Sequence, residues 1–93
     1  MKQADIALEN NTLHLSGELD FFNVMSVYDK SLSLVTGEHA IVDFSRLIDA
    51  NSAGIALMIA WKKHWQNVEF RHVSAELKSI ASVAGLNELL ALS

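Results

Sequence analysis

The sequence predicts an α/β domain: a mixed four-stranded sheet, mostly parallel after an N-terminal hairpin, covered by three to four helices. Two observations lead to this class. Short segments with strand-like apolar patterns are separated by longer segments with apolar residues at helical spacing. After the hairpin, strands and helices alternate, which favours parallel neighbours in the order β-β-α-β-α-β-α. No linker or low-complexity segment divides residues 1–93, so one continuous domain is expected.

The first half of the chain is expected to form the hairpin, one helix and one strand. Residues 5–15 alternate apolar and polar side chains around the Asn10-Asn11 pair, which tolerates the left-handed conformations of a tight turn. Helical spacing from Phe21 to Val35 predicts a helix with Asp20 as its N-cap. The apolar stretch 39–44 predicts a short strand buried on both faces, followed by a polar turn.

The second half is expected to add two helical segments and a last strand. Asn51 is a good N-cap for a helix that begins at Ser52 and ends near Gln66. Alternation over residues 68–73 predicts a strand. The tail from residue 75 to Leu92 is predicted to be helical, interrupted at Gly85 before a short last turn.

Charge and composition exclude several function classes. The net charge is −4, and the basic residues are scattered except for the adjacent Lys62 and Lys63. Nucleic-acid binding and binding to an anionic membrane surface both need concentrated positive charge. The chain has no Cys, so disulfides, thiolate metal sites and cysteine nucleophiles are absent. No signal peptide precedes the first strand, and the longest apolar run, Ala53 to Trp61, is far shorter than the roughly 20 residues of a membrane span. We therefore expect a cytoplasmic protein without direct membrane insertion.

The helix that begins at Ser52 is apolar on more than one side. At about 100° per residue, one stripe is expected to face the core, and it contains Gly54, Leu57, Met58, Trp61 and Trp65. The opposite side is expected to face solvent, and it contains Ser52, Ile55, Ile59, Lys62, Lys63 and Gln66, with Ala56 between the isoleucines. This side is either a small apolar patch of the kind that partner proteins bind or an ordinary surface.

Two roles are open for Ser52. A phosphoryl group there would be stabilised by the helix N-terminus and would place about −1.5 to −2 charges beside Ile55 and Ile59. Alternatively, Ser52 only caps the helix, as serines commonly do. Arg46, in the expected turn before the helix, is either an exposed contact residue near Ser52 or a solvated loop charge.

No pattern supports catalysis, a metal or a nucleotide. A serine nucleophile needs a histidine base with an orienting acid, but no motif surrounds the four histidines, His14, His39, His64 and His72. The residues around Ser52 do not form a nucleophile elbow. Asp43 and Asp49 lack metal-ligand spacing with the histidines, and Asp43 is expected to accept backbone N–H groups of the following turn. Gly54 alone cannot form a phosphate-binding loop.

Three segments resemble STAS domains, the family of anti-sigma factor antagonists. They are "LSGELD" (residues 15–20), "IVDFSRLIDANSAGIALM" (residues 41–58) and "LKSIASVAGLNELL" (residues 77–90). Together they extend the resemblance over nearly the whole chain. Within the family, the segments are most similar to the MlaB-like branch, the STAS subunits of Mla phospholipid-transport ABC complexes.

The resemblance implies a non-enzymatic protein without cofactors that docks onto a partner. Ser52 matches the family's regulatory Ser/Thr. The partner would be a cytoplasmic ABC-transporter ATPase (MlaF-like), which would hold the protein at the inner membrane, or an anti-sigma factor with serine kinase activity. Asn51 stands where the family usually has an acidic residue, which disfavours the phosphorylation switch. The partner-binding residues would be Asn51, Ser52, Ile55, Ala56, Ile59, Lys63 and Arg46.

Overall fold

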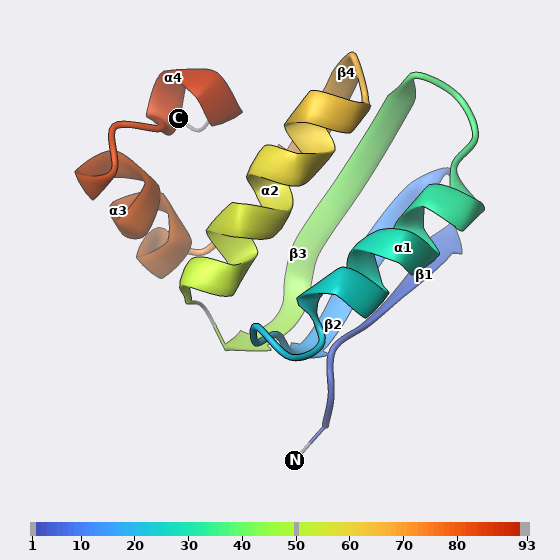
Figure 1. Ribbon diagram of the computed structural model, residues 1–93, viewed down its shortest axis with the longest axis horizontal. Coiled ribbons are helices and arrows are strands. Elements are labelled where there is room, and N and C mark those ends of the chain that lie inside the picture. The colour runs from blue at the N-terminus through green and yellow to red at the C-terminus, as the bar shows by residue number, and fades with distance from the viewer. Residues whose placement is uncertain (1, 50, 92–93) are drawn as a thin grey trace.

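The computed structural model describes residues 2–49 and 51–91, which form a four-stranded mixed sheet and four helices (Figure 1). The strands are β1 (Asp5–Glu9), β2 (Thr12–Glu18), β3 (His39–Asp49) and β4 (Asn67–Arg71). The helices are α1 (Val24–Leu34), α2 (Ser52–His64), α3 (Ala75–Val83) and α4 (Asn87–Leu90). The strands lie in the order β1-β2-β3-β4; β1 and β2 are antiparallel, and the other neighbours are parallel. The predicted fold class is confirmed.

The predicted N-terminal hairpin is confirmed. Its two loop residues, Asn10 and Asn11, have φ angles of 52° and 63°. Positive φ at both positions gives the turn twist that matches two antiparallel strands, and Asn tolerates it better than most residues. The turn sets the β1–β2 register so that Ile6 and Leu15 pair on the buried face.

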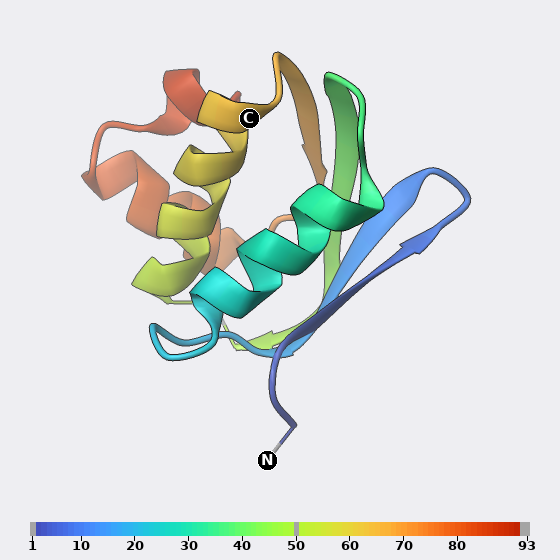
Figure 2. The ribbon, with the colours of Figure 1, turned by 45° about the vertical axis from the view of Figure 1, so that its right-hand side comes forward.

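The helices gather on one side of the sheet (Figures 1 and 2). Strand–helix–strand connections are right-handed, so two that cross the sheet in the same direction place their helices on the same face. The connections β2–α1–β3 and β3–α2–β4 do this. The prediction that β3 is buried on both faces is therefore wrong: Val42 is fully buried under the helices, whereas its neighbour Ile41 is half-buried.

The predicted core stripe of α2 is confirmed. Trp61 and Trp65 are fully buried and stack with their ring centroids 6.1 Å apart. The indole N–H of Trp61 donates a hydrogen bond to Oγ of Ser31 on α1 at 2.8 Å. Gly54 lies so close to α3 that a Cβ atom there would be 3.0 Å from Cδ2 of Leu77. These contacts fix α2 between α1 and α3.

β3 is longer than predicted. The polar turn expected after Phe44 is instead strand as far as Asp49, because β2 pairs with it at Ser16–Arg46 and Glu18–Asp49, with shifts in the register. Polar side chains are tolerated there because one face of the sheet carries no helix. Asp43 therefore lies within a strand rather than at its end.

α1 is shorter than predicted. It begins at Val24, and the carboxylate of Asp20 accepts hydrogen bonds from the backbone N–H groups of Phe22 and Asn23 at 2.8 and 2.9 Å. Asp20 thus forms a turn ahead of the helix instead of capping it. As a result, Phe21 and Phe22 lie in the turn and are 65% and 98% exposed.

The C-terminal elements follow the prediction with one difference. β4 ends at Arg71, two residues early, because His72 has a left-handed φ of 57°. Gly85 has a φ of 72° after the end of α3, as expected of a residue that ends a helix. Leu92, the last residue of the predicted helical tail, lies outside the described residues.

Asp43 joins β3 to the end of β4. Its Oδ1 accepts the backbone N–H of Ser45 at 2.7 Å, so the predicted acceptor role is confirmed. Its Oδ2 accepts a hydrogen bond from Nδ1 of His72 at 2.8 Å. Burial raises the pKa of the Asp43 carboxyl, but the hydrogen bonds from Ser45 and His72 outweigh burial and lower the pKa to about 2.

This lowered pKa predicts an acid-sensitive contribution to stability. A carboxylate whose pKa falls from 3.8 to about 2 on folding stabilises the folded state above pH 4 by about 2 kcal/mol and loses that contribution as the pH falls toward 2. Asp43→Asn should therefore lower the free energy of unfolding at pH 7, and the difference from wild type should shrink as the pH falls. Urea unfolding at several pH values measures this; a constant difference would contradict the assignment.

Candidate functional site

Ser52 is exposed at the first turn of α2, and the preceding residue caps the helix. Oδ1 of Asn51 accepts the backbone N–H of Ala53 at 2.9 Å, which confirms Asn51 as the N-cap. Within residues 2–49 and 51–91, the Ser52 hydroxyl has no hydrogen-bond partner. Asn51, not Ser52, is therefore the cap, and Ser52 is exposed at the positive end of the helix.

Asn51 makes a second bond that explains why an amide suits this position. Its Nδ2 donates to the carbonyl oxygen of Leu19 at 2.7 Å. One side chain thus caps α2 and fastens it to the segment between β2 and α1. A carboxylate could accept the Ala53 N–H but has no hydrogen to donate to Leu19.

The outer side of α2 is narrower than predicted. Ser52, Ala56 and Lys63 are exposed, and Ile59 is half-buried beside them. Ile55, expected in the exposed patch, is only 7% exposed and belongs to the core. The prediction for Ile55 is wrong because α2 packs against more than the sheet: α1 lies on one side of it, and α3 and α4 lie on the other (Figure 1).

Arg46 does not lie in a turn beside Ser52. It is part of β3, opposite Ser16 of β2. Its Nη1 donates a hydrogen bond to Oε2 of Glu9, at the end of β1, at 3.1 Å. Both side chains are about half exposed, so this ion pair adds little stability. The predicted contact role near Ser52 is therefore not supported by its position.

Sequence periodicity missed two exposed apolar side chains, Phe21 in the turn before α1 and Met25 in the first turn of α1. Met25 is 62% exposed. It lies three residues before Tyr28, so the two side chains are neighbours on the surface of α1. The Tyr28 ring in turn contacts His64, the last residue of α2, edge-on, with the ring centroids 6.4 Å apart. Phe21, 65% exposed, is two residues from Leu19, which Asn51 binds. The sequence contained one signal for the exposure of Phe21: it lies with Phe22 between Asp20 and Asn23, and Asp and Asn are residues that favour turns.

The exposed and half-buried residues on α1, α2 and the turn before α1 include one hydroxyl, one cation and several apolar groups. We call this set the α1–α2 surface, and it comprises Phe21, Met25, Ser52, Ala56, Ile59 and Lys63. Phe22 is not included, because it lines a hollow with Gln3 and Ala4 instead. Such a surface can hold a partner protein through its apolar groups, and a phosphoryl group on Ser52 would add negative charge to it.

The described residues give no support for a catalytic histidine or a metal site. His72 is bound to Asp43, and His64 packs against Tyr28 and Trp65. Within residues 2–49 and 51–91, no three His, Asp or Glu side chains come together as metal ligands. None of the helices in these ranges is long and apolar enough to cross a bilayer.

Comparison with known families agrees with the geometry. A family model described as Mlab, STAS domain matches residues 3–91. No curated protein matches the sequence. STAS domains are small protein-interaction and regulatory domains and are generally not catalytic. With a matching family model over nearly its whole length and the mixed sheet expected of this fold, the chain belongs to the MlaB-like STAS domain family.

Proposed function

We propose that this protein is a non-enzymatic accessory subunit that docks onto the cytoplasmic ATPase of an Mla-type phospholipid ABC transporter. The contact would be made by the α1–α2 surface. The match to the MlaB-like STAS model over residues 3–91 supports the choice of partner. The observation that carries the choice of surface is the exposure of Ser52 together with Phe21 and Met25 on neighbouring elements.

The composition of this surface suits a protein interface. Interfaces combine an apolar centre, rich in aromatic residues and Met, with a polar rim. Phe21, Met25 and Ala56 would supply the centre together with the Ser52 hydroxyl, and Lys63 would supply part of the rim. Because Asn51 caps α2, the Ser52 side chain is not needed for the helix and is free to contact a partner.

Capture from co-expression tests the proposal. The tagged protein, expressed with an Mla-type ATPase subunit, should retain that subunit through purification. Ser52→Glu should reduce the captured ATPase at least tenfold, because a carboxylate would be desolvated among apolar groups. Ser82→Glu, the same change at an exposed serine of α3, is the matched control and should have no effect. Wild-type protein that captures no ATPase, or equal loss in both variants, would refute the proposal.

Ser52→Ala separates the interface role of the hydroxyl from folding. Its free energy of unfolding should stay within about 0.5 kcal/mol of wild type, because the variant retains the Asn51 cap. Partner binding should nevertheless weaken. Full ATPase capture by Ser52→Ala would show that the hydroxyl takes no part in the interface.

A second candidate is an anti-sigma factor antagonist that is released from its partner when Ser52 is phosphorylated. The exposed hydroxyl, unbonded to any described residue, at a helix N-terminus favours this candidate. Asn51 weighs against it, since no carboxylate precedes Ser52 to assist phosphoryl transfer. Mass spectrometry of the protein from cells distinguishes the two: a phosphoryl group on Ser52, with a serine kinase captured in place of an ATPase, would establish the second.

A further inference from the structure

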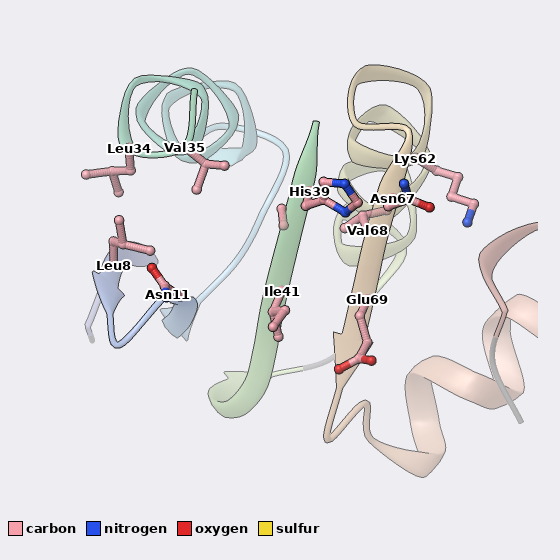
Figure 3. Close-up of a pocket in the computed structure, with 11 residues that line it drawn as sticks. Leu8, Asn11, Leu34, Val35, His39, Ile41, Lys62, Asn67, Val68 and Glu69 are labelled. Atoms are coloured by element: carbon pink, nitrogen blue, oxygen red, sulfur yellow. The ribbon is translucent and has the colours of Figure 1, made fainter. Parts of the chain in front are cut away.

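The β1–β2 hairpin diverges from the beginning of β3 (Figure 2). A groove of about 680 Å³ opens there and continues past β3 to β4 (Figure 3). It lies at the opposite end of β3 from Ser52, which follows Asp49. The part of the groove between the hairpin and β3 is lined by Leu8, Asn11, Leu34, Val35, Ala40 and Ile41. Its volume falls within the range of binding pockets.

One wall of the groove is an unpaired strand edge. His39, Ala40 and Ile41 pair with residues 67–69 of β4 on one side. On the other side, pairing with β2 starts only at Val42, opposite Leu13. The backbone of three residues of β3 therefore has no strand partner toward the hairpin. An edge of this kind can bind an extended peptide through main-chain hydrogen bonds.

Apart from Asn11, the side chains that line this part of the groove are aliphatic. Leu8 is 40% exposed, and Leu34, Val35 and Ile41 are half-buried. Figure 3 shows Leu8 below Leu34, the last residue of α1, and Val35, which follows it, on one side of the gap and Ile41 on β3 on the other. The charged lining residues lie beyond β3: Lys62 extends away from the gap, and Glu69 is paired with Arg71 (Figure 3). The gap therefore suits an uncharged aliphatic occupant.

We propose that this groove binds an extended peptide segment of a partner protein, which adds as a short strand to the free edge of β3 and places aliphatic side chains beside Leu8 and Val35. A small polar molecule would leave the apolar walls uncovered. An extended peptide can hydrogen-bond to the free edge of β3 through its backbone and cover the walls with its side chains. The outer edge of the sheet at β1 is less suitable, because β1 carries the charged Asp5 and Glu9, which pair with Lys30 and Arg46. The site does not depend on the proposed ATPase docking.

Amide-shift mapping by NMR with a defined peptide tests the site. The probe is an end-blocked peptide of alternating Val and Thr flanked by Lys, added to the full chain. Shift changes should centre on residues 39–41 and on the methyl groups of Leu8 and Val35. Val35→Asp should weaken binding at least tenfold, because it brings a charge into the gap. Val83→Asp, the same change at an 89% exposed position on α3, should not change the affinity.

N-methylated versions of the same peptide test the strand pairing itself, without changing the protein. Methyl groups on alternate amides block one edge of an extended peptide and leave its side chains unchanged. Two such peptides exist, because either set of alternate amides can be methylated. The peptide whose methylated edge faces β3 should bind at least tenfold more weakly, and the other should not. The proposal is overturned if about 1 mM peptide gives no shift changes, if the changes map to the outer edges of β1 or β4, or if both methylated peptides bind as well as the parent.

Discussion

The double variant Phe21→Asp, Met25→Asp should bind the proposed ATPase partner about 100-fold more weakly than wild type, or worse. Aromatic side chains at the centre of an interface often contribute about 2 kcal/mol each, and every 1.4 kcal/mol is a factor of ten in affinity. Here two carboxylates would also be desolvated on binding. In the free protein the change should be tolerated, because both side chains are more than 60% exposed. Titration calorimetry gives the affinity, and urea unfolding verifies the fold.

Phe22→Asp is the matched control for this variant. Phe22 is adjacent in sequence and 98% exposed, but it lines a hollow with Gln3 and Ala4, outside the α1–α2 surface. Its affinity should remain within about threefold of wild type, as expected of a residue outside the interface. If Phe22→Asp weakens binding as much as the double variant, the interface lies on the N-terminal side of α1. If the double variant binds normally, docking through Phe21 and Met25 is wrong.

Features that depend on a few neighbouring residues could be predicted from the sequence. The Asn10-Asn11 turn is favoured by the residue type alone, because Asn accepts positive φ. Asn51 as N-cap follows from its place before an apolar helix. The buried stripe through Trp61 and Trp65 follows from helical periodicity. In each case local chemistry and the tertiary fold agree.

Features that depend on how many elements pack around a helix or strand could not be predicted from the sequence. Periodicity locates the face of α2 that meets the sheet, but Ile55 is buried because helices also flank α2 on both sides. The polar end of β3 resembles a turn in sequence, yet Arg46 lies in a strand because the sheet has an uncovered face. Both errors come from contacts between residues far apart in the chain.

The exposure of Phe21 has a different origin, a competition between two local signals. Apolar spacing favours a helix that starts at Phe21, whereas the Asp20 carboxylate binds the N–H groups of the next turn. The turn prevails and leaves Phe21 outside the helix. The turn thus makes Phe21, which helical periodicity alone would have placed in the core, available to the proposed interface.

Asn51→Asp should lower the free energy of unfolding at pH 7 by about 2–3 kcal/mol, although Asp caps helices as well as Asn does. The variant keeps an acceptor for the Ala53 N–H but loses the donor to the Leu19 carbonyl, now 2.7 Å from Nδ2. A carboxylate oxygen would face that carbonyl oxygen in a half-buried site. Favourable interaction with the helix dipole offsets only about 0.3–1 kcal/mol of this cost.

The pH dependence of the Asn51→Asp variant separates repulsion from simple loss of the bond. Repulsion from the Leu19 carbonyl disfavours the ionised form and so raises the pKa of the new carboxyl in the folded state. The stability deficit should therefore shrink as the pH falls through this raised pKa toward about 4, the pKa of an aspartate in the unfolded chain, because a protonated carboxyl can again donate to Leu19. Asn51→Ser, whose single shorter hydroxyl can replace Oδ1 as the cap but not Nδ2 toward Leu19 as well, adds no charge; it should cost less at pH 7 and show no such recovery. Urea unfolding of both variants from pH 3 to 7 decides this; equal, pH-independent losses would show that charge plays no part in the requirement for Asn51.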